Sequence, residues 1–282
     1  MVDVTMFKDA KVFNCSCIML YSHWRGKKPL FDLALFSTPY PSMLGWGVSV
    51  EDYVAYWLPE KVVGITMDMS NKGVIIQNIW FPRLKYGGYD DRIFKIPDIY
   101  RAEGWNLEET YIWDKKNAPP SGNMKRHDRN EWEFIFVFAK SPGYTYHKFR
   151  EPYAEKTVGK AATGNMRKPD LNGQLAGGHS KLHPEGAAQG NILRYSPSGD
   201  QGRPRIKGRV FPRGLAERLI LQYSNPRDIV YDPFCGSGTT LVMATANDRQ
   251  SVGCEIDPYA YEVACNWLYD EDLKRSREKE NA

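Results

Sequence analysis

The residues with the clearest chemical potential form a glycine-rich run at 232–240, Asp-Pro-Phe-Cys-Gly-Ser-Gly-Thr-Thr. This run lies between a β-branched segment and a segment of helical character, a context in which glycine-rich turns form ligand sites. Gly236 and Gly238 permit positive φ angles and let a ligand approach the backbone, and Thr239 or Thr240 can cap the following helix. The run therefore predicts a ligand-binding turn between a strand and a helix.

A carboxylate is spaced to complete this site. Glu255 ends the next apolar segment, 23 positions beyond Asp232, and a carboxylate there can accept both hydroxyls of a ribose. The glycine spacing differs from G-x-G-x-x-G, and no Lys follows as in a phosphate-binding loop. We therefore expect a nucleoside ligand without a pyrophosphate. The alternative is an ordinary left-handed turn, which the paired Glu255 disfavours.

A second motif, Ser37-Thr38-Pro39-Tyr40, follows an apolar segment in the first quarter of the chain. Pro39 favours an extended turn and lacks a donor, which leaves carbonyl groups free to accept hydrogen bonds. Tyr40 offers a flat face on which a base can stack, and Ser37 adds a hydroxyl. Two acceptors that hold the hydrogens of an exocyclic amine would turn its nitrogen toward an electrophile, without a covalent intermediate. Alone, this tetrapeptide also occurs as a plain turn, so its significance depends on its pairing with the glycine-rich run.

The elements that must position these motifs alternate in type. Short apolar segments predict strands, and amphipathic segments predict helices. The predicted strands are 31–36, 73–80, 133–139, 228–231 and 251–256, and the predicted helices are 50–63, 212–223, 239–248 and one that starts at 258–268, before a charged tail that we expect to fray. Near-continuous apolar strands separated by helices predict an α/β fold whose sheet is mainly parallel and covered on both faces.

Composition separates one segment from the rest. Residues 141–208 are rich in Gly, Pro, Asn, Ser and Gln and contain eleven Lys or Arg against five Asp or Glu. This segment alone is more basic than the whole chain of 282 residues, whose net charge is +4. One interpretation is a solvated loop; the other is a surface that meets a polyanion through its phosphates.

The remaining composition bounds the class of protein. The sequence has no apolar stretch long enough to span a bilayer and no secretory signal at its start, which predicts no association with a membrane. Five cysteines, an odd number, are interpreted as reduced thiols, and a cytoplasmic location is expected. His179-x-x-x-His183 has helical metal spacing, but its glycine-rich surroundings lack further ligands, so no metal site is predicted.

These motifs resemble those of a known family. The run at 232–240 is similar to the S-adenosylmethionine loop of DNA amino-methyltransferases, and residues 37–40 resemble their S/D/N-P-P-Y catalytic motif. Residues 104–115 are similar to their G-(aromatic)…I-W-x-K stretch, residues 131–140 to their E-x-x-x-x-F-x-K strand, and Phe211-Pro212 with Arg218 to their F-P-x-x-L-x-x-R helix. The catalytic motif precedes the cofactor loop, which is the circularly permuted order of the β group, many of whose members belong to restriction–modification systems.

The resemblance implies a fold and a division of the chain. The fold is a Rossmann-like methyltransferase sandwich with a mostly parallel, seven-stranded sheet that contains one antiparallel strand. Residues 1–140 would form the catalytic half of the domain, 141–208 the target recognition region, and 209–282 the half that binds S-adenosylmethionine. Double-stranded DNA, with the target base flipped out, is the implied partner. A homodimer and a cognate restriction endonuclease are further partners that the resemblance suggests.

The resemblance also implies residue roles. The cofactor would be held by Asp232, Pro233, Phe234, Gly236, Ser237, Gly238 and Thr239, with Glu255 on its ribose and with Phe211 and Pro212 as a wall of its pocket. The target amine would be oriented by Ser37, Thr38, Pro39 and Tyr40. No covalent nucleophile is required: Cys235 lies inside the cofactor loop, and no Pro-Cys dipeptide occurs in the chain.

The chain departs from the family at two positions. Thr38 stands where the family usually has a proline, and Asn14-Cys15-Ser16-Cys17 stands where these enzymes often have N-G-D-C, so a carboxylate near the adenine end of the cofactor is missing.

The target base is inferred from the first residue of the catalytic motif. Ser in this position goes mostly with N4-cytosine in the family, so Ser37 favours N4 of cytosine, with N6 of adenine as the alternative. A methyltransferase acting on protein or RNA is a third interpretation, which the motif order disfavours. An inactive module that binds the cofactor or DNA is a fourth, for which Thr38 is the only indication.

Overall fold

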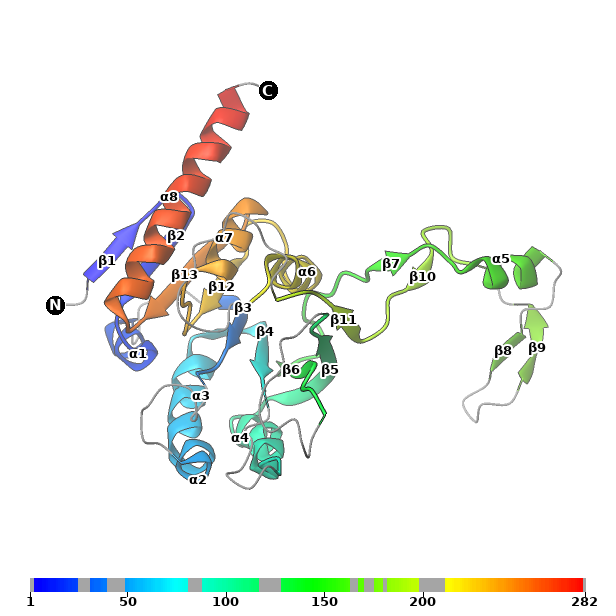
Figure 1. The fold of residues 1–282 in the computed structure, drawn as a ribbon, viewed down its shortest axis with the longest axis horizontal. Helices are drawn as coiled ribbons and strands as arrows, with labels where there is room; N and C mark the ends of the chain where they lie inside the picture. The colour runs from blue at the N-terminus through cyan, green and yellow to red at the C-terminus, as the bar shows by residue number, and fades with distance from the viewer. Residues whose placement is uncertain are drawn as a thin grey trace. The chain divides into compact units, whose positions relative to one another are not determined.

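A computed structural model describes residues 3–24, 31–39, 49–80, 88–116, 128–162, 167–169, 175–179, 182–197 and 211–280 (Figure 1). The chain divides into two compact units, one formed by residues 1–146 and 191–282 and the other by residues 147–190. Both motifs identified in the sequence belong to the first unit, which is described first.

The first unit is built on a single sheet of nine described strands, in the order β1-β2-β13-β12-β3-β4-β6-β5-β11. The strands β2, β13, β12, β3 and β4 are parallel to one another, and β6 is antiparallel to both of its neighbours. In sheet order, the strands are β1 (Asp3–Met6), β2 (Ala10–Asn14), β13 (Gln250–Glu255), β12 (Ile229–Asp232), β3 (Phe31–Ser37), β4 (Met69–Ile79), β6 (Trp132–Ala139), β5 (Asn106–Asp114) and β11 (Ile192–Arg194).

The expected fold class is confirmed, but the sheet has more strands than the seven expected. The additional strands lie at the edges: β1 forms an antiparallel hairpin with β2, and β11 pairs in parallel with β5. The sheet therefore contains two strands that run against the majority, β1 as well as the expected internal strand β6. Both added strands are short and mostly exposed, so they lack the apolar runs from which the buried strands were predicted.

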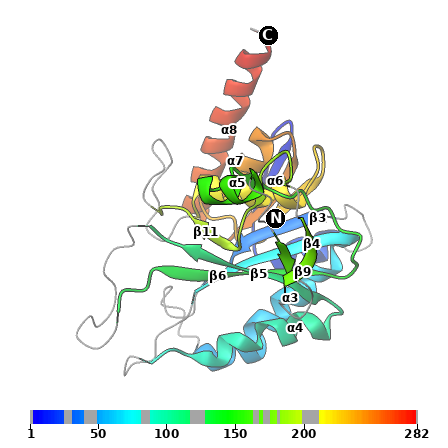
Figure 2. The ribbon, with the colours of Figure 1, turned by 90° about the vertical axis from the view of Figure 1, so that its right-hand side faces the viewer.

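Helices cover both faces of the sheet (Figure 2). Alternate residues of the buried strands enter opposite cores, as in β3, where Ala34 and Phe36 face one core and Leu33 and Leu35 the other. The core that contains Phe36 is covered by α1 (Cys17–Trp24), η1 (Tyr53–Trp57), α3 (Leu58–Met67), η2 (Asp91–Lys95) and α4 (Ile96–Ala102), and the opposite core is covered by α6 (Arg213–Tyr223), α7 (Thr239–Ala246) and α8 (Pro258–Glu280).

The predicted helix at 50–63 is confirmed and is longer than expected. It comprises α2 (Val50–Asp52), the π-helical turn η1 and α3, and it ends at Met67. The wide turn ends directly before Leu58-Pro59. Since a proline ring collides with the carbonyl four residues earlier in a regular α-helix, a widened turn before Pro59 accommodates the ring without breaking the helix.

The charged tail was expected to fray, and this expectation is wrong, because α8 continues to Glu280. Arg275 forms ion pairs with Asp9 at 3.0 Å and with Asp248 at 2.6 Å, and its side chain is largely buried. These contacts join the helix to two separate turns of the first unit. A charged segment that looks solvated in the sequence is thus held by partners distant along the chain.

The second unit contains short elements only. The strand β7 (Arg150–Glu151) pairs with β10 (Ala187–Ala188), and β8 (Arg167–Pro169) pairs with β9 (Leu175–His179). The helix α5 (Glu155–Ala162) has no buried residue. Arg150 donates a hydrogen bond from Nη1 to the carbonyl of Gly186 at 2.8 Å. This unit falls inside the basic segment 141–208, while β11 of the same segment belongs to the main sheet.

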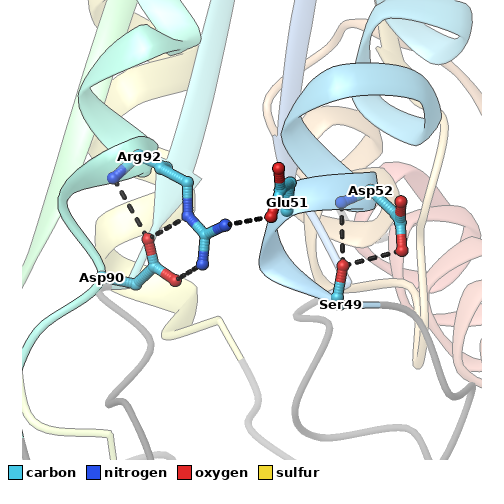
Figure 3. Close-up of polar contacts among 5 residues, drawn as sticks. All are labelled: Ser49, Glu51, Asp52, Asp90 and Arg92. Atoms are coloured by element: carbon cyan, nitrogen blue, oxygen red, sulfur yellow. Dashed lines mark hydrogen bonds and ion pairs between the residues drawn. The ribbon is translucent and has the colours of Figure 1, made fainter.

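The helical segments that follow β3 and β4 are joined at their starts by Arg92 (Figure 3). Ser49 caps α2 by accepting a hydrogen bond from the backbone N–H of Asp52 at 3.0 Å. Asp90 caps η2 and binds the Arg92 guanidinium with both oxygens, at 2.8 Å to Nε and 2.6 Å to Nη2. The remaining Nη1 of Arg92 donates to Glu51 at 3.0 Å. Arg92 therefore connects the first turn of α2 to the first turn of η2.

This contact predicts a pH-dependent contribution to stability. The Arg92 guanidinium holds the pKa of the buried Asp90 carboxyl below its ordinary value, so its stabilising charge is present at neutral pH and lost as the pH falls through that lowered pKa. We expect Asp90→Asn to lower the free energy of unfolding by about 1–3 kcal/mol at pH 7, with a smaller effect at pH 3. Urea denaturation followed by tryptophan fluorescence measures both values.

The matched control is Asp98→Asn, which removes an exposed carboxylate that pairs with Arg101. Exposed pairs contribute about 1 kcal/mol or less, so this variant should change little at either pH. An effect of Asp90→Asn that is the same at pH 3 and pH 7 would contradict the role given to the charge.

Candidate active site

The two motifs start from neighbouring strands. β12 and β3 are parallel, with Val230 opposite Leu33 and Tyr231 opposite Ala34, so their carboxyl ends meet at the same edge of the sheet. β13 pairs in parallel with β12 on the other side, and it ends at Glu255. In open α/β sheets, ligands bind in the crevice outside the carboxyl ends of such strands. This edge is therefore the candidate active site.

The glycine-rich loop after β12 is fixed by its own backbone. Cys235 donates its N–H to the carbonyl of Cys254 at 2.9 Å, and Gly238 donates to the carbonyl of Cys235 at 2.8 Å. Gly236 and Gly238 have φ angles of 52° and 87°, which favour glycine. A Cβ atom at Gly238 would also lie 3.0 Å from the Cβ of Ala264 in α8. The tight loop thus requires glycine at 238 for both its conformation and its packing.

Glu255 connects the end of β13 to this loop. Its Oε2 accepts the N–H of Gly236 at 2.9 Å, and its Oε1 accepts the N–H of Asp257 at 2.8 Å. Asn14, at the end of β2, donates from Nδ2 to the Glu255 carbonyl at 2.9 Å. Because a carboxylate oxygen can accept two hydrogen bonds, the half-buried Glu255 retains acceptor capacity for a ligand that carries hydroxyl groups.

Asp232 lies beneath the loop and is almost fully buried. Its Oδ1 accepts the backbone N–H of Phe234 at 3.0 Å. Burial raises the pKa of Asp232 most strongly, hydrogen bonds from Phe234 and Thr240 lower it, and the neighbouring Glu255 raises it, so that the pKa is about 7. Burial also raises the pKa of Glu255. A ligand with a positive charge would stabilise the ionised forms of both carboxyl groups, so the raised pKa values favour a cationic ligand at this site.

Aromatic contacts join the loop to the first half of the chain. The Phe234 ring packs edge-on against Phe36 of β3, with centroids 5.7 Å apart, and stacks with Trp57 at 5.7 Å. Trp57 in turn stacks on Tyr53 at 5.0 Å. The helical pattern alone could not identify Trp57 as the residue that packs against the distant loop.

The turn after β3 is anchored by a residue that the sequence did not single out. Thr38 is buried, and its Oγ1 accepts a hydrogen bond from Nε2 of Gln77 in β4 at 3.2 Å. Ser37 and Pro39 are half-buried beside it, and Tyr40 lies outside the described residues. The structure therefore brings Ser37, Thr38 and Pro39 to the same edge as the glycine-rich loop. A glutamine within an apolar strand, next to a polar turn, is the signal that could have identified Gln77.

The segment before α6 packs against β5, on the face of the sheet that α6, α7 and α8 cover. Pro212 is the N-cap of α6, and the Phe211 ring packs edge-on against Trp113 of β5, with centroids 6.1 Å apart. The two stretches at 104–115 and 131–140 also meet here, because Lys115 and Glu133 form a buried ion pair. The position of Phe211 and Pro212 in the wall of a cofactor pocket stays a prediction.

The remaining candidates have simpler surroundings. Cys235 is buried and burial raises the pKa of its thiol well above the ordinary value, so it is poorly suited to act as a nucleophile. His183 accepts the N–H of Glu185 on Nδ1, and the side chain of His179 lies outside the described residues. Within the described ranges, no group of three or more His, Cys, Asp or Glu could hold a metal ion, and no helix has the length and apolar character needed to span a bilayer.

The raised pKa of Asp232 predicts a measurable pH dependence. Between about pH 4 and pH 7 the folded protein keeps a proton on Asp232 that the unfolded chain has lost, so this group destabilises the fold as the pH rises. We expect Asp232→Asn to gain stability relative to the wild type between pH 5 and pH 8, by at most about 1.4 kcal/mol for each pH unit. Urea denaturation of the ligand-free protein at both pH values measures this difference.

Asp270→Asn, on the exposed side of α8, is the control and should follow the pH profile of the wild type. Profiles of wild type and Asp232→Asn that run parallel from pH 5 to pH 8 would contradict the raised pKa.

Comparison with known proteins identifies similar sequences and folds. A family model named N6_N4_Mtase and described as DNA methylase matches residues 69–266. The orphan methyltransferase M.BamHII of Bacillus amyloliquefaciens is 33% identical over 240 residues, which cover 83% of this chain and 86% of that protein. The chain spans about half the length of several type II methyltransferases that it also matches.

Solved structures share the architecture. The cytosine-N4-specific PvuII DNA methyltransferase has a TM-score of 0.71 at 16% identity, covering 95% of this chain and 93% of that one. The M1.HpyAVI-SAM complex has a TM-score of 0.58 at 18% identity, covering 92% and 99%. At these identities the likeness shows that the fold is shared.

Proposed function

The chain belongs to the DNA methylase family, and we propose that it transfers a methyl group from S-adenosylmethionine to the exocyclic N4 of a flipped cytosine in double-stranded DNA. The observation that carries this proposal is the parallel pairing of β12 with β3. Because the glycine-rich loop follows β12 and the turn at 37–39 follows β3, both begin at the same edge of the sheet. A methyl donor bound at the loop and an amine held at the turn would then share one cleft.

The residues at this edge fit the proposed cofactor. S-adenosylmethionine combines a ribose, a carboxylate and a positively charged sulfonium, and when bound it supplies an electrophilic methyl group. Glu255 offers acceptors for the ribose hydroxyls. The raised pKa values of Asp232 and Glu255 favour a cationic ligand. The tight turn at Gly236 and Gly238 allows close approach to the backbone. The acceptors on Glu255 thus match the ribose, and the preference for a cation matches the sulfonium, whereas a dinucleotide would bring a negatively charged pyrophosphate.

The turn after β3 orients the target amine. The Ser37 hydroxyl and a backbone carbonyl of the turn accept the two N–H groups of the amine, which directs the nitrogen lone pair toward the methyl group. Tyr40 stacks on the flipped base and offsets part of the cost of unstacking it, a few kcal/mol. The protein thus contributes mainly alignment and exclusion of water, since the methyl donor is already reactive.

The basic segment 141–208 contacts the DNA. Its excess of Lys and Arg supplies the attraction to phosphates, and its compact part, residues 147–190, presents side chains to the bases of the target site. A cognate endonuclease, a homodimer and a cytoplasmic location stay predictions of the sequence.

The choice of cytosine N4 rests on Ser37, the first residue of the catalytic motif. Adenine N6 is the alternative target, since the name of the matched family includes both chemistries. The missing carboxylate at Asn14-Cys15-Ser16-Cys17 does not separate the two, because it concerns the cofactor.

The reaction product tests the proposal directly. We expect N4-methylcytosine when the purified protein is incubated with S-adenosylmethionine and unmethylated genomic DNA, because Ser37 presents a hydroxyl acceptor to the amine. Mass spectrometry of the released nucleosides identifies the product. N6-methyladenine would favour the alternative target, and the absence of either nucleoside, with the cofactor bound, would favour an inactive module.

Two substitutions should separate cofactor binding from transfer. Glu255→Gln is expected to weaken S-adenosylmethionine binding about 10- to 100-fold, since a charged acceptor for two hydroxyls is lost, and calorimetric titration measures this affinity.

Tyr40→Ala is expected to abolish transfer while the cofactor affinity stays within about twofold, whereas Tyr40→Phe keeps a stacking ring and part of the activity.

Glu262→Gln, on the exposed surface of α8, is the control for the loss of a carboxylate. Unchanged cofactor affinity in Glu255→Gln would contradict the pocket assignment, and full activity in Tyr40→Ala would contradict the stacking role.

A further inference from the structure

Thr38 occupies the position at which related catalytic motifs usually have a proline, yet its side chain is held firmly. It is 1% exposed, and Gln77, which donates a hydrogen bond from Nε2 to Thr38 Oγ1 at 3.2 Å, is 0% exposed. Thr38 directly follows β3 and Gln77 lies in the adjacent parallel strand β4, in which Asn78 is opposite Ser37. Thr38 therefore connects the start of the turn to a rigid, central strand of the sheet.

Two constraints on Thr38 replace those of a proline ring. A proline fixes its own φ near −65°. Thr38 lacks this ring, but it precedes Pro39, which disfavours the helical region for the residue before it. Its β-branched side chain is stiff at χ1, and the bond from Gln77 fixes the rotamer that remains. The backbone of the turn is thus restricted from both sides without a second proline.

Gln77 is a poor choice for stability alone. It lies in β4 between Ile75 and Ile79, which belong to the core that also contains Phe36. Among the described residues its Oε1 has no hydrogen-bond partner, and a buried acceptor atom without a partner costs about 1–3 kcal/mol. A leucine would fill this apolar position without that cost. The glutamine therefore requires a reason other than packing, and the contact with Thr38 supplies one.

We propose that Gln77 is a positioning residue that holds the catalytic turn through the hydroxyl of Thr38, so that the Gln77–Thr38 pair takes the place of the motif's usual proline. This inference rests on the proposed function, because it assumes that the turn at 37–40 orients the target amine. Gln77 acts through Thr38 on the backbone of the turn.

A double-mutant cycle tests this role. We expect Gln77→Leu and Thr38→Val each to lower kcat for DNA methylation about tenfold, with KM for S-adenosylmethionine within about twofold, because the turn loses order while the cofactor loop is untouched. The variant with both substitutions should lose no more than either alone, since one contact is removed in all three. Gln77→Leu should keep or increase the free energy of unfolding.

A rescue by proline gives a second test. Thr38→Pro combined with Gln77→Leu restores the usual motif and is expected to recover kcat to within about threefold of the wild type, because the ring then fixes the turn. Thr66→Val is the matched control: it removes a buried hydroxyl that donates to the Val63 carbonyl at 3.1 Å in α3, and it should leave kcat unchanged.

The outcomes separate this inference from the proposed function. If the wild-type protein transfers no methyl group, the proposed function is contradicted. Amide hydrogen exchange of residues 31–39 then tests the role of Gln77 without any activity measurement. Unchanged exchange in Gln77→Leu overturns the positioning role, whereas faster exchange supports it. With active protein, the role is overturned by wild-type kcat in Gln77→Leu, by additive losses in the cycle, or by a proline double variant that folds and is no more active than Gln77→Leu.

Discussion

The parallel pairing of β12 with β3 is the constraint on which the rest of the site depends. The two strands come from opposite ends of the chain, and their register places Tyr231 opposite Ala34. Because the loop at 233–238 and the turn at 37–39 each begin within a few residues of this pairing, their relative position is fixed by backbone hydrogen bonds. A motif order that separates the two by most of the sequence therefore has no consequence for the geometry at the edge of the sheet.

The electrostatics of the site follow from this arrangement. Asp232 and Glu255 end neighbouring strands, so the fold brings two carboxyl groups together in partly buried positions. Burial raises the pKa of both groups, and the Glu255 carboxylate adds to the increase at Asp232. Such a site is unfavourable when empty of cations and becomes favourable when a positive ligand is bound. The same two carboxyl groups therefore lower the stability of the ligand-free fold and raise its affinity for a cationic cofactor.

Much of this architecture could be predicted from local sequence, and the exceptions have a common cause. The strands β3, β4, β6, β12 and β13 and the helices over 50–63, 212–223 and 239–248 were predicted because their apolar patterns reflect local burial, whereas β2 and β5 were not predicted. The glycine-rich loop was predicted from Gly236 and Gly238, whose positive φ angles are a local requirement. In contrast, the edge strands β1 and β11 and the helical tail of α8 depend on partners that are distant along the chain.

The same distinction applies to the candidate site. The side chains that offer chemistry were visible as motifs, whereas the residues that hold them were not. Trp57 stacks on Phe234, and Gln77 donates to Thr38, through contacts that no spacing rule relates. Motif residues can be found from the sequence because chemistry restricts their type. Supporting residues are restricted only by what they touch, so they require the folded structure.

The way these side chains are held indicates which catalytic strategy the fold suits. The buried Cys235 thiol, with its raised pKa, does not offer a nucleophile at the cofactor loop. Buried side chains instead hold both segments: Phe36 and Trp57 pack against Phe234 of the loop, and Gln77 donates a hydrogen bond to Thr38 of the turn. For a direct transfer between two bound groups, restricting their relative motion can supply about 7–11 kcal/mol of the barrier. Buried aromatic and amide side chains that fix the loop and the turn are therefore suited to aligning the two reacting groups. The reactivity itself comes from the bound methyl donor.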